Sequence, residues 1–102
     1  RITRLNQQEA MAFLDSDIRL AEMVADHWLP SWTSMDDTRQ RALINMCFNL
    51  GNRIGQFTHF LDAMKAADWK AAAKEMLASK WAGQVGARAQ RLAAMIETGV
   101  DV

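Results

Sequence analysis

Acidic side chains near the N-terminus are the first candidates for chemistry, because paired carboxyl groups can act as general acid and base. Hydrolysis of a glycosidic bond needs two carboxyl groups about 5–9.5 Å apart, and the acid of the pair needs a raised pKa. Glu9 and Asp17 would lie roughly 12 Å apart along one helix. Glu22 and Asp26 would be neighbours on a face that we expect to be solvated. Neither pair predicts a complete hydrolase site.

The other reactive side chains do not predict a catalytic centre either. His27 and His59 stand apart in the sequence, without the paired ligand spacing that zinc requires. Cys47 lies in the most apolar segment, which favours a small core residue over a nucleophile. The chain has no phosphate-binding glycine loop, nucleophile elbow or dinucleotide fingerprint. We therefore expect no metal and no cofactor.

Two groups of side chains could bind a ligand without reacting with it. Arg88 and Arg91 share one face at the start of a helix, where two guanidinium groups fit carboxylate recognition; exposed solubilising charge is an equally good interpretation. Trp28 and Trp32 flank Pro30 and could stack on sugar rings, but in a small helical domain we expect them to pack.

Composition predicts the kind of domain that must position these residues. The chain has 102 residues, no net charge, one cysteine, and is half hydrophobic. This length predicts a single domain over residues 1–102, and the abundance of Ala, Met, Leu, Gln, Arg and Lys predicts an all-α fold. The longest uncharged run, residues 42–52, is about half of a bilayer span, so we expect no membrane span.

Charge is unevenly distributed along the chain. Residues 9–37 hold seven acidic residues against Arg19 alone, a net charge of −6, so the rest of the chain carries +6. We expect an acidic region and a basic region, as in an acidic helix packed beside a basic one. Without a dense run of Lys and Arg, nucleic acid is not an expected partner.

Apolar spacing predicts a long first helix over about residues 6–26 and a central helix over about residues 37–50. Pro30 ends the first helix, and Ser34 or Asp36 can cap the second. The central helix is apolar on nearly all sides, so other helices must enclose it. Asn45 and Asn49 lie one turn apart on it, and are either satisfied internally or exposed in a groove.

The remaining helices are expected within residues 57–98. The apolar pattern predicts helices over residues 57–66, 69–78 and 87–98, with Asp68 as an N-terminal cap and Gly99 as a stop. Between the last two, Trp81 is expected in a tight connection that Gly83 and Gly86 loosen. The sequence therefore predicts a compact bundle of five or six helices around a buried central helix.

Several ordered stretches carry a resemblance to a known family. They are Arg39-Gln-Arg-Ala-Leu-Ile-Asn-Met-Cys-Phe-Asn-Leu-Gly51, Gly55-Gln-Phe-Thr58, Trp69-Lys-Ala-Ala-Ala73, Ser79-Lys-Trp81, Arg88-Ala-Gln-Arg91 and Thr98-Gly99. Together with Ile2-Thr3, Glu9-Ala10 and Asp17, they closely resemble the C-terminal helical lobe of phage-type lysozymes of the T-even coliphage kind. The match covers essentially the whole chain.

The resemblance implies an enzyme divided between two lobes. Members are muramidases that cut the N-acetylmuramic acid to N-acetylglucosamine link of peptidoglycan, in a cleft between a small N-terminal lobe and this helical lobe. Their catalytic Glu, with an Asp and a Thr, belongs to the N-terminal lobe. Glu9 and Asp17 do not match that pattern, so no catalytic residue is assigned here.

We therefore expect the substrate-facing lobe of a lysozyme or endolysin, inactive alone, whose partners are peptidoglycan glycan strands and an N-terminal lobe in cis or in trans. Such a protein is made in the host bacterial cytoplasm and acts at the cell wall by a route that this chain does not encode. The alternative is a non-catalytic module, derived from a lysozyme, that binds peptidoglycan or a protein. An unrelated regulatory helical bundle is a third possibility.

The resemblance also implies roles for single residues in the substrate cleft. Asn49 and Leu50 match the cleft floor, where an amide can bond a sugar N-acetyl group and where relatives often carry Gln and Met. Phe60, Glu75 and Lys80 match the cleft edge. Phe60 replaces a small polar residue of one relative, so we expect it to narrow the groove.

Contact with the catalytic lobe is implied for two arginines. Arg88 matches the arginine that pairs with the catalytic Glu across the lobes, and Arg91 is a helix neighbour that faces the same lobe. Trp69 and Trp81 match aromatic residues of the core, so we expect both to pack.

Overall fold

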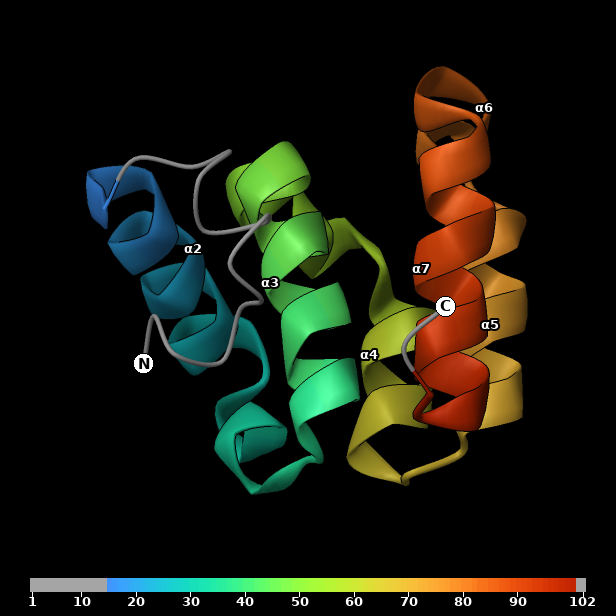
Figure 1. Ribbon diagram of the computed structural model, residues 1–102, viewed down its shortest axis with the longest axis horizontal. Helices are drawn as coiled ribbons and strands as arrows, with labels where there is room; N and C mark the ends of the chain where they lie inside the picture. Colours follow the sequence, from blue (N-terminus) through green and yellow to red (C-terminus); the bar gives the residue numbers. More distant parts are fainter. Residues whose placement is uncertain (1–14, 101–102) are drawn as a thin grey trace.

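The computed structural model describes residues 15–100 and shows an all-α fold in this range (Figure 1). It contains six α-helices and two short 3-10 helices: α2 (Asp15–Trp28), η2 (Pro30–Ser34), α3 (Asp37–Leu50), η3 (Gly51–Gln56), α4 (Thr58–Lys65), α5 (Trp69–Leu77), α6 (Lys80–Val85) and α7 (Ala87–Thr98). The all-α prediction is confirmed. The predicted start of the first helix, with Glu9, lies outside the described residues, as does the Asp17 side chain.

Helix α2 ends at Trp28, two residues beyond the expected end. Pro30 then opens η2, because a fixed φ suits the first position of a helix and its missing N–H costs nothing there. Trp32 is fully buried and donates its indole N–H to Asp26 Oδ1 at 2.7 Å. Trp32 is therefore a core residue, as expected.

The prediction of a solvated acidic face on the first helix is wrong at Glu22, which is only 8% exposed.

Helix α3 is the enclosed central helix that the sequence predicts. Asp36 caps it by accepting the Arg39 backbone N–H at 3.0 Å, and it ends at Gly51, whose φ of +56° favours glycine. The helix lies between α2 and α7 (Figure 1). Its buried residues are Gln40, Ala42, Leu43, Ile44, Asn45, Met46, Cys47 and Leu50.

Two connections expected to be irregular are helical. The loop expected through Gly55 is the 3-10 helix η3, and the connection expected around Trp81 is helix α6. Ser79 caps α6 by accepting the Ala82 backbone N–H at 3.3 Å. The expectation that Gly83 loosens the chain is wrong, because Gly83 lies inside α6.

The remaining helix ends follow the predicted signals. Asp68 caps α5 by accepting the Ala71 N–H at 3.3 Å, and Gly99 ends α7 in the left-handed conformation.

Candidate ligand-binding groove

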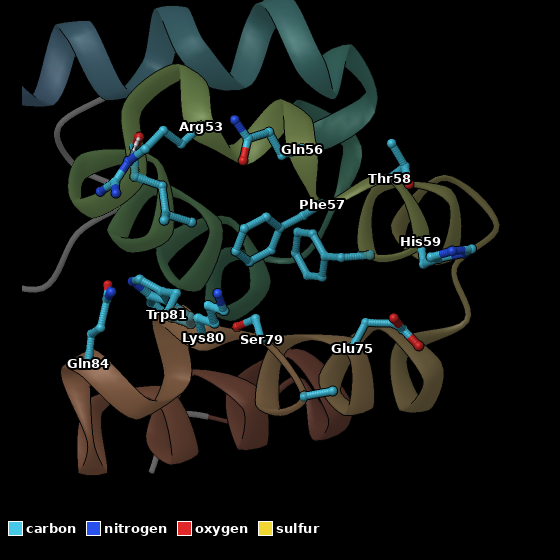
Figure 2. Close-up of a pocket in the computed structure, with 13 residues that line it drawn as sticks. Arg53, Gln56, Phe57, Thr58, His59, Glu75, Ser79, Lys80, Trp81 and Gln84 are labelled. Atoms are coloured by element: carbon cyan, nitrogen blue, oxygen red, sulfur yellow. Dashed lines mark hydrogen bonds between the residues drawn. The ribbon is translucent and has the colours of Figure 1, made fainter.

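An open groove of about 470 Å³ lies between two helical walls (Figure 2). One wall comes from η3 and the start of α4, and the other from the end of α5 and from α6. The lining residues are Leu50, Arg53, Gln56, Phe57, Thr58, His59, Phe60, Glu75, Ala78, Ser79, Lys80, Trp81 and Gln84.

The floor of the groove is apolar and belongs to the hydrophobic core. Leu50, Phe60 and Trp81 are 5%, 1% and 4% exposed, and Phe57 is half-buried. Phe60 lies on the buried stripe of α4, while Leu50 is the last residue of central helix α3. Because these side chains are fixed by core packing, the floor is preformed and rigid.

The rim of the groove is polar and mostly exposed. Gln56, His59, Lys80 and Gln84 are exposed, and Glu75 is half-buried. Figure 2 places His59 and Glu75 at one end, on opposite walls, and Arg53 and Gln84 at the other end. A polar rim around an apolar floor is the usual make-up of a small-molecule site.

The polar groups of the groove do not include a pair of carboxyl groups. Glu75 is the one carboxyl group among the lining residues described, and a glycosidase needs two. The hydroxyl of Ser79 is already committed, since it donates to Met76 O at 2.6 Å and accepts from Ala82 N at 3.3 Å. The buried Glu22 on α2 is not part of the lining.

Asn49 and Arg88 meet beside the groove, although 39 positions separate them. Arg88 Nη1 donates to Asn49 Oδ1 at 3.4 Å, and Asn49 Nδ2 donates to Asn45 O at 2.9 Å. Arg53 donates to the backbone carbonyls of Asn49 and Leu50 at 3.4 and 3.3 Å. Of the two alternatives for Asn49, internal satisfaction is therefore found. The Arg88 contact is long and exposed, so it is weak.

The predicted cleft residues mostly converge on this groove. Leu50, Phe60, Glu75 and Lys80 line it, while Asn49 is next in sequence to Leu50 but does not line it. Phe60 was expected at the edge; it lies in the floor instead, because the apolar stripe of α4 faces the core. Arg91 is exposed on α7, one turn after Arg88.

Sequence reasoning missed several lining residues, Trp81 above all. Trp81 was expected only to pack, in a segment expected to be irregular. Once residues 80–85 are helical, Trp81 and Gln84 share a face by their spacing of three, and that face lines the groove. The signal that could have found them was Ser79, whose hydroxyl caps α6.

Nucleophilic and metal chemistry have no centre in the part of the chain that the structure describes. Cys47 is buried, and burial raises its pKa from 9.0 to about 12, so the thiolate is scarce at neutral pH. His27 packs edge-on against the Trp28 ring, with 4.7 Å between ring centroids. Within residues 15–100 no three His, Cys, Asp or Glu side chains are grouped to hold a metal ion.

Comparison with known proteins gives one family and several relatives. The family model for phage lysozyme matches residues 1–96. The pre-baseplate central spike protein Gp5 of Enterobacteria phage T4 is 39% identical over 71 residues, which are 69% of this chain and 12% of that protein. Probable T4-type lysozymes 1 and 2 of Dictyostelium discoideum are 38% and 32% identical over 69 residues, 67% of this chain. The chain spans about two fifths (41%) of these two relatives.

Proposed function

The chain belongs to the phage lysozyme family, and on that premise we propose that it is the C-terminal, substrate-facing lobe of a lysozyme that cleaves the glycan backbone of peptidoglycan. In this proposal the groove binds the glycan strand. The proton donor comes from a catalytic N-terminal lobe, in cis or in trans, so the chain alone is inactive.

One observation carries this proposal. Four of the five cleft residues that the family resemblance implies line a single groove, although they come from α3, α4, α5 and α6. Arg88, the implied contact to the catalytic lobe, reaches the fifth of them, Asn49. Sequence order alone does not bring these residues together.

The groove suits a glycan for chemical reasons. Half-buried Phe57 on its apolar floor offers contact to sugar faces and acetamido methyl groups, and its amide and charged rim offers partners to hydroxyl groups. Among the described lining residues Glu75 has no second carboxyl partner, which supports an acid supplied from outside these helices.

Arg88 is suited to hold the other lobe. Its guanidinium is exposed and, within residues 15–100, makes one long contact, to a neutral amide. A carboxylate would bind it more strongly, because charge-assisted pairs are roughly twice as strong as neutral hydrogen bonds. Arg88 is therefore proposed to exchange the Asn49 amide for a carboxylate of the catalytic lobe, with Arg91 beside it.

The proposal places the working protein at the bacterial cell wall, as an endolysin made in the host cytoplasm. Within residues 15–100, none of the helices combines the length and the apolar content that a membrane span requires.

Binding to purified peptidoglycan sacculi tests the proposal, with a matched pair of variants. Ala78 and Ala66 are both exposed residues that end a helix in right-handed conformation, but only Ala78 lines the groove. Ala78→Trp should fill the groove and abolish co-sedimentation with sacculi, while Ala66→Trp should bind like the unmodified chain. Equal binding by both variants would contradict the proposal that this groove binds the glycan strand.

A second function is favoured by one relative. In the T4 spike protein the matched segment is only 12% of the chain, so the family's helices also occur inside a much larger protein that is named for a structural role. The alternative is thus a non-catalytic module that binds peptidoglycan or a protein. Adding a catalytic lobe distinguishes the two functions: the enzyme lobe gains activity against sacculi, and the module binds without cleaving.

A further inference from the structure

Two arginines approach Asn49 from different elements. Arg53, in η3, donates to the backbone oxygens of Asn49 and Leu50 at 3.4 and 3.3 Å. Arg88, in α7, donates to Asn49 Oδ1 at 3.4 Å. All three hydrogen bonds are longer than the usual range of about 2.7–3.2 Å, so they are weak. Two cationic side chains are thus brought to the end of α3 and are held there only loosely.

The fold does not neutralise either guanidinium group. In the part of the chain that the structure describes, neither Arg53 nor Arg88 forms an ion pair, whereas Arg39 pairs with Asp36 at 2.9 Å. A guanidinium has more N–H groups than these contacts occupy, and both side chains are exposed, so each keeps donors for a ligand. Two cations that share one neighbour repel each other, and an anion bound between them offsets this repulsion.

The surroundings of this arginine pair also favour an anion. Glu75, the one carboxyl group among the described lining residues, lies at the opposite end of the groove from Arg53 (Figure 2). Exposed Lys80 lines the same groove. The carbonyl groups at the end of α3 offset part of the charge of Arg53, whereas Arg88 lies in the first turn of α7, where the helix dipole adds positive potential.

We propose that Arg53 and Arg88 form a binding site for a free tetrahedral oxyanion of the phosphate class. One guanidinium binds two oxygens side by side, so a carboxylate satisfies one arginine, whereas phosphate has further oxygens for a second. The multiple charge of phosphate also matches two cations better than a single carboxylate does. Because both side chains are exposed, changes of rotamer suffice to bring them onto one anion.

Phosphate at this site competes with the catalytic lobe. This step rests on the proposed function, in which Arg88 exchanges the Asn49 amide for a carboxylate of that lobe. An Arg88 side chain that is bound to phosphate is no longer available to that carboxylate. Phosphate should therefore weaken docking of the lobe by more than its contribution to ionic strength explains.

Nuclear magnetic resonance of the 15N-labelled 102-residue chain tests the site, because the Nε–H group of each arginine gives its own signal. Inorganic phosphate is titrated at fixed pH and constant ionic strength, with chloride as the balancing anion, so that general screening does not change. We expect saturable shifts of the Arg53 and Arg88 signals, while the signal of exposed Arg19 on α2 stays in place. The absence of a saturable shift, or equal shifts at all three arginines, would overturn the inference.

Affinity for phosphate gives a second readout. Arg53→Gln and Arg88→Gln should each weaken phosphate binding roughly ten- to hundredfold, which corresponds to one hydrogen bond from a charged donor. Arg53→Lys keeps the charge but loses the planar guanidinium, so it should recover only part of the affinity.

Arg19→Gln is the matched control, because it removes the same charge from an exposed position outside the groove lining. It should bind phosphate like the unmodified chain. Equal losses in all three glutamine variants would show that phosphate responds only to net charge, and would overturn the inference. If a variant fails to fold, the arginine signals of the unmodified chain decide.

The outcomes separate this inference from the proposed function. If phosphate shifts both arginine signals but the chain does not bind sacculi, the oxyanion site stands and the proposed function fails. If the chain binds sacculi but phosphate gives no saturable shift, the proposed function stands and this inference fails. With a catalytic lobe added, unchanged activity at saturating phosphate and constant ionic strength would overturn the competition.

Discussion

At the scale of single residues, burial decides which side chains are available for chemistry. Cys47, Phe60 and Glu22 are all nearly inaccessible, although their types alone would allow nucleophilic, stacking or acid–base roles. The sequence predicted burial for Cys47 because its whole helix is apolar. It could not predict burial of Glu22, because a carboxylate on an amphipathic helix is normally solvated.

The buried thiol gives the first prediction. A pKa raised from 9.0 to about 12 means that the folded chain resists ionisation of Cys47. The protonated Cys47 thiol therefore makes its full contribution to the unfolding free energy below pH 9. This contribution is lost as the pH rises from 9 to about 12. The unfolding free energy should fall across this window by up to about 1.4 kcal/mol per pH unit more than in Cys47→Ala. Urea titrations of both chains at several pH values measure this difference, and parallel curves would contradict it.

The family resemblance, but not residue chemistry, predicted that Leu50, Phe60, Glu75 and Lys80 line one groove. Arg88 and Arg91 left two interpretations open on their spacing alone, and the contact between Arg88 and Asn49 depends on how α7 packs on α3. The place of Trp81 in the groove lining was not predictable, because it depends on residues 80–85 forming a helix.

At the scale of helices, Arg39 joins three elements. From the start of α3 it donates to the α7 carbonyls of Ile96 and Glu97 at 2.6 and 3.0 Å, and its guanidinium lies 4.3 Å from the ring centroid of Trp69 on α5. It also pairs with Asp36 at 2.9 Å. The last carbonyl groups of a helix have no hydrogen-bond partner within the helix, so a cation that donates to them stabilises the helix end.

Removing this arginine should therefore destabilise the bundle. Arg39→Ala should lower the unfolding free energy by about 2–4 kcal/mol, since each hydrogen bond from a charged donor contributes about 1.5–3 kcal/mol. Arg19→Ala is the control, because Arg19 is exposed on α2. Substitutions of exposed residues usually change the unfolding free energy by no more than about 0.5 kcal/mol. Chemical denaturation compares the two variants; equal small losses would show that Arg39 does not hold α7 in place.

The two glycines near α6 should respond in opposite directions. An added Cβ meets nothing within 4 Å at either Gly83 or Gly86, but Gly86 has a φ of +60° whereas Gly83 lies inside the helix. Gly83→Ala should stabilise the chain by about 0.4–1 kcal/mol, because alanine lowers the conformational entropy of the unfolded chain. Gly86→Ala should destabilise it by about 1–2 kcal/mol. Thermal melts give both signs, and destabilisation by Gly83→Ala would argue against a helical α6.

Helix prediction succeeded where caps and apolar spacing agree. For α3, α5 and α7 a capping carboxylate or a terminal glycine marks an end, and the structure has these helices within one residue of the predicted bounds. It failed for α6, which is six residues long and contains Gly83. Propensity is uninformative over so short a segment, and packing against α7 decides its conformation.

At the scale of the molecule, the helices pack into a core and leave the candidate groove open at its surface. Helix α3 crosses the core, α2 lies on one side, and α5 and α7 lie on the other (Figure 1). The acidic residues Asp26, Asp36 and Asp37 are exposed on or beside α2 and η2, whereas exposed Arg53 lines the groove and exposed Arg88 lies beside it. These two arginines present cations where a carboxylate-bearing lobe is proposed to dock.

The most direct measurement is the release of reducing ends from purified sacculi by the 102-residue chain alone, at concentrations that saturate binding. We expect no release above background, because Glu75 is the one carboxyl group among the described residues that line the groove, and we expect release once a catalytic lobe of the family is added. Sustained release by the chain alone, lost on Glu75→Gln, would contradict the division of substrate binding and acid catalysis between two lobes.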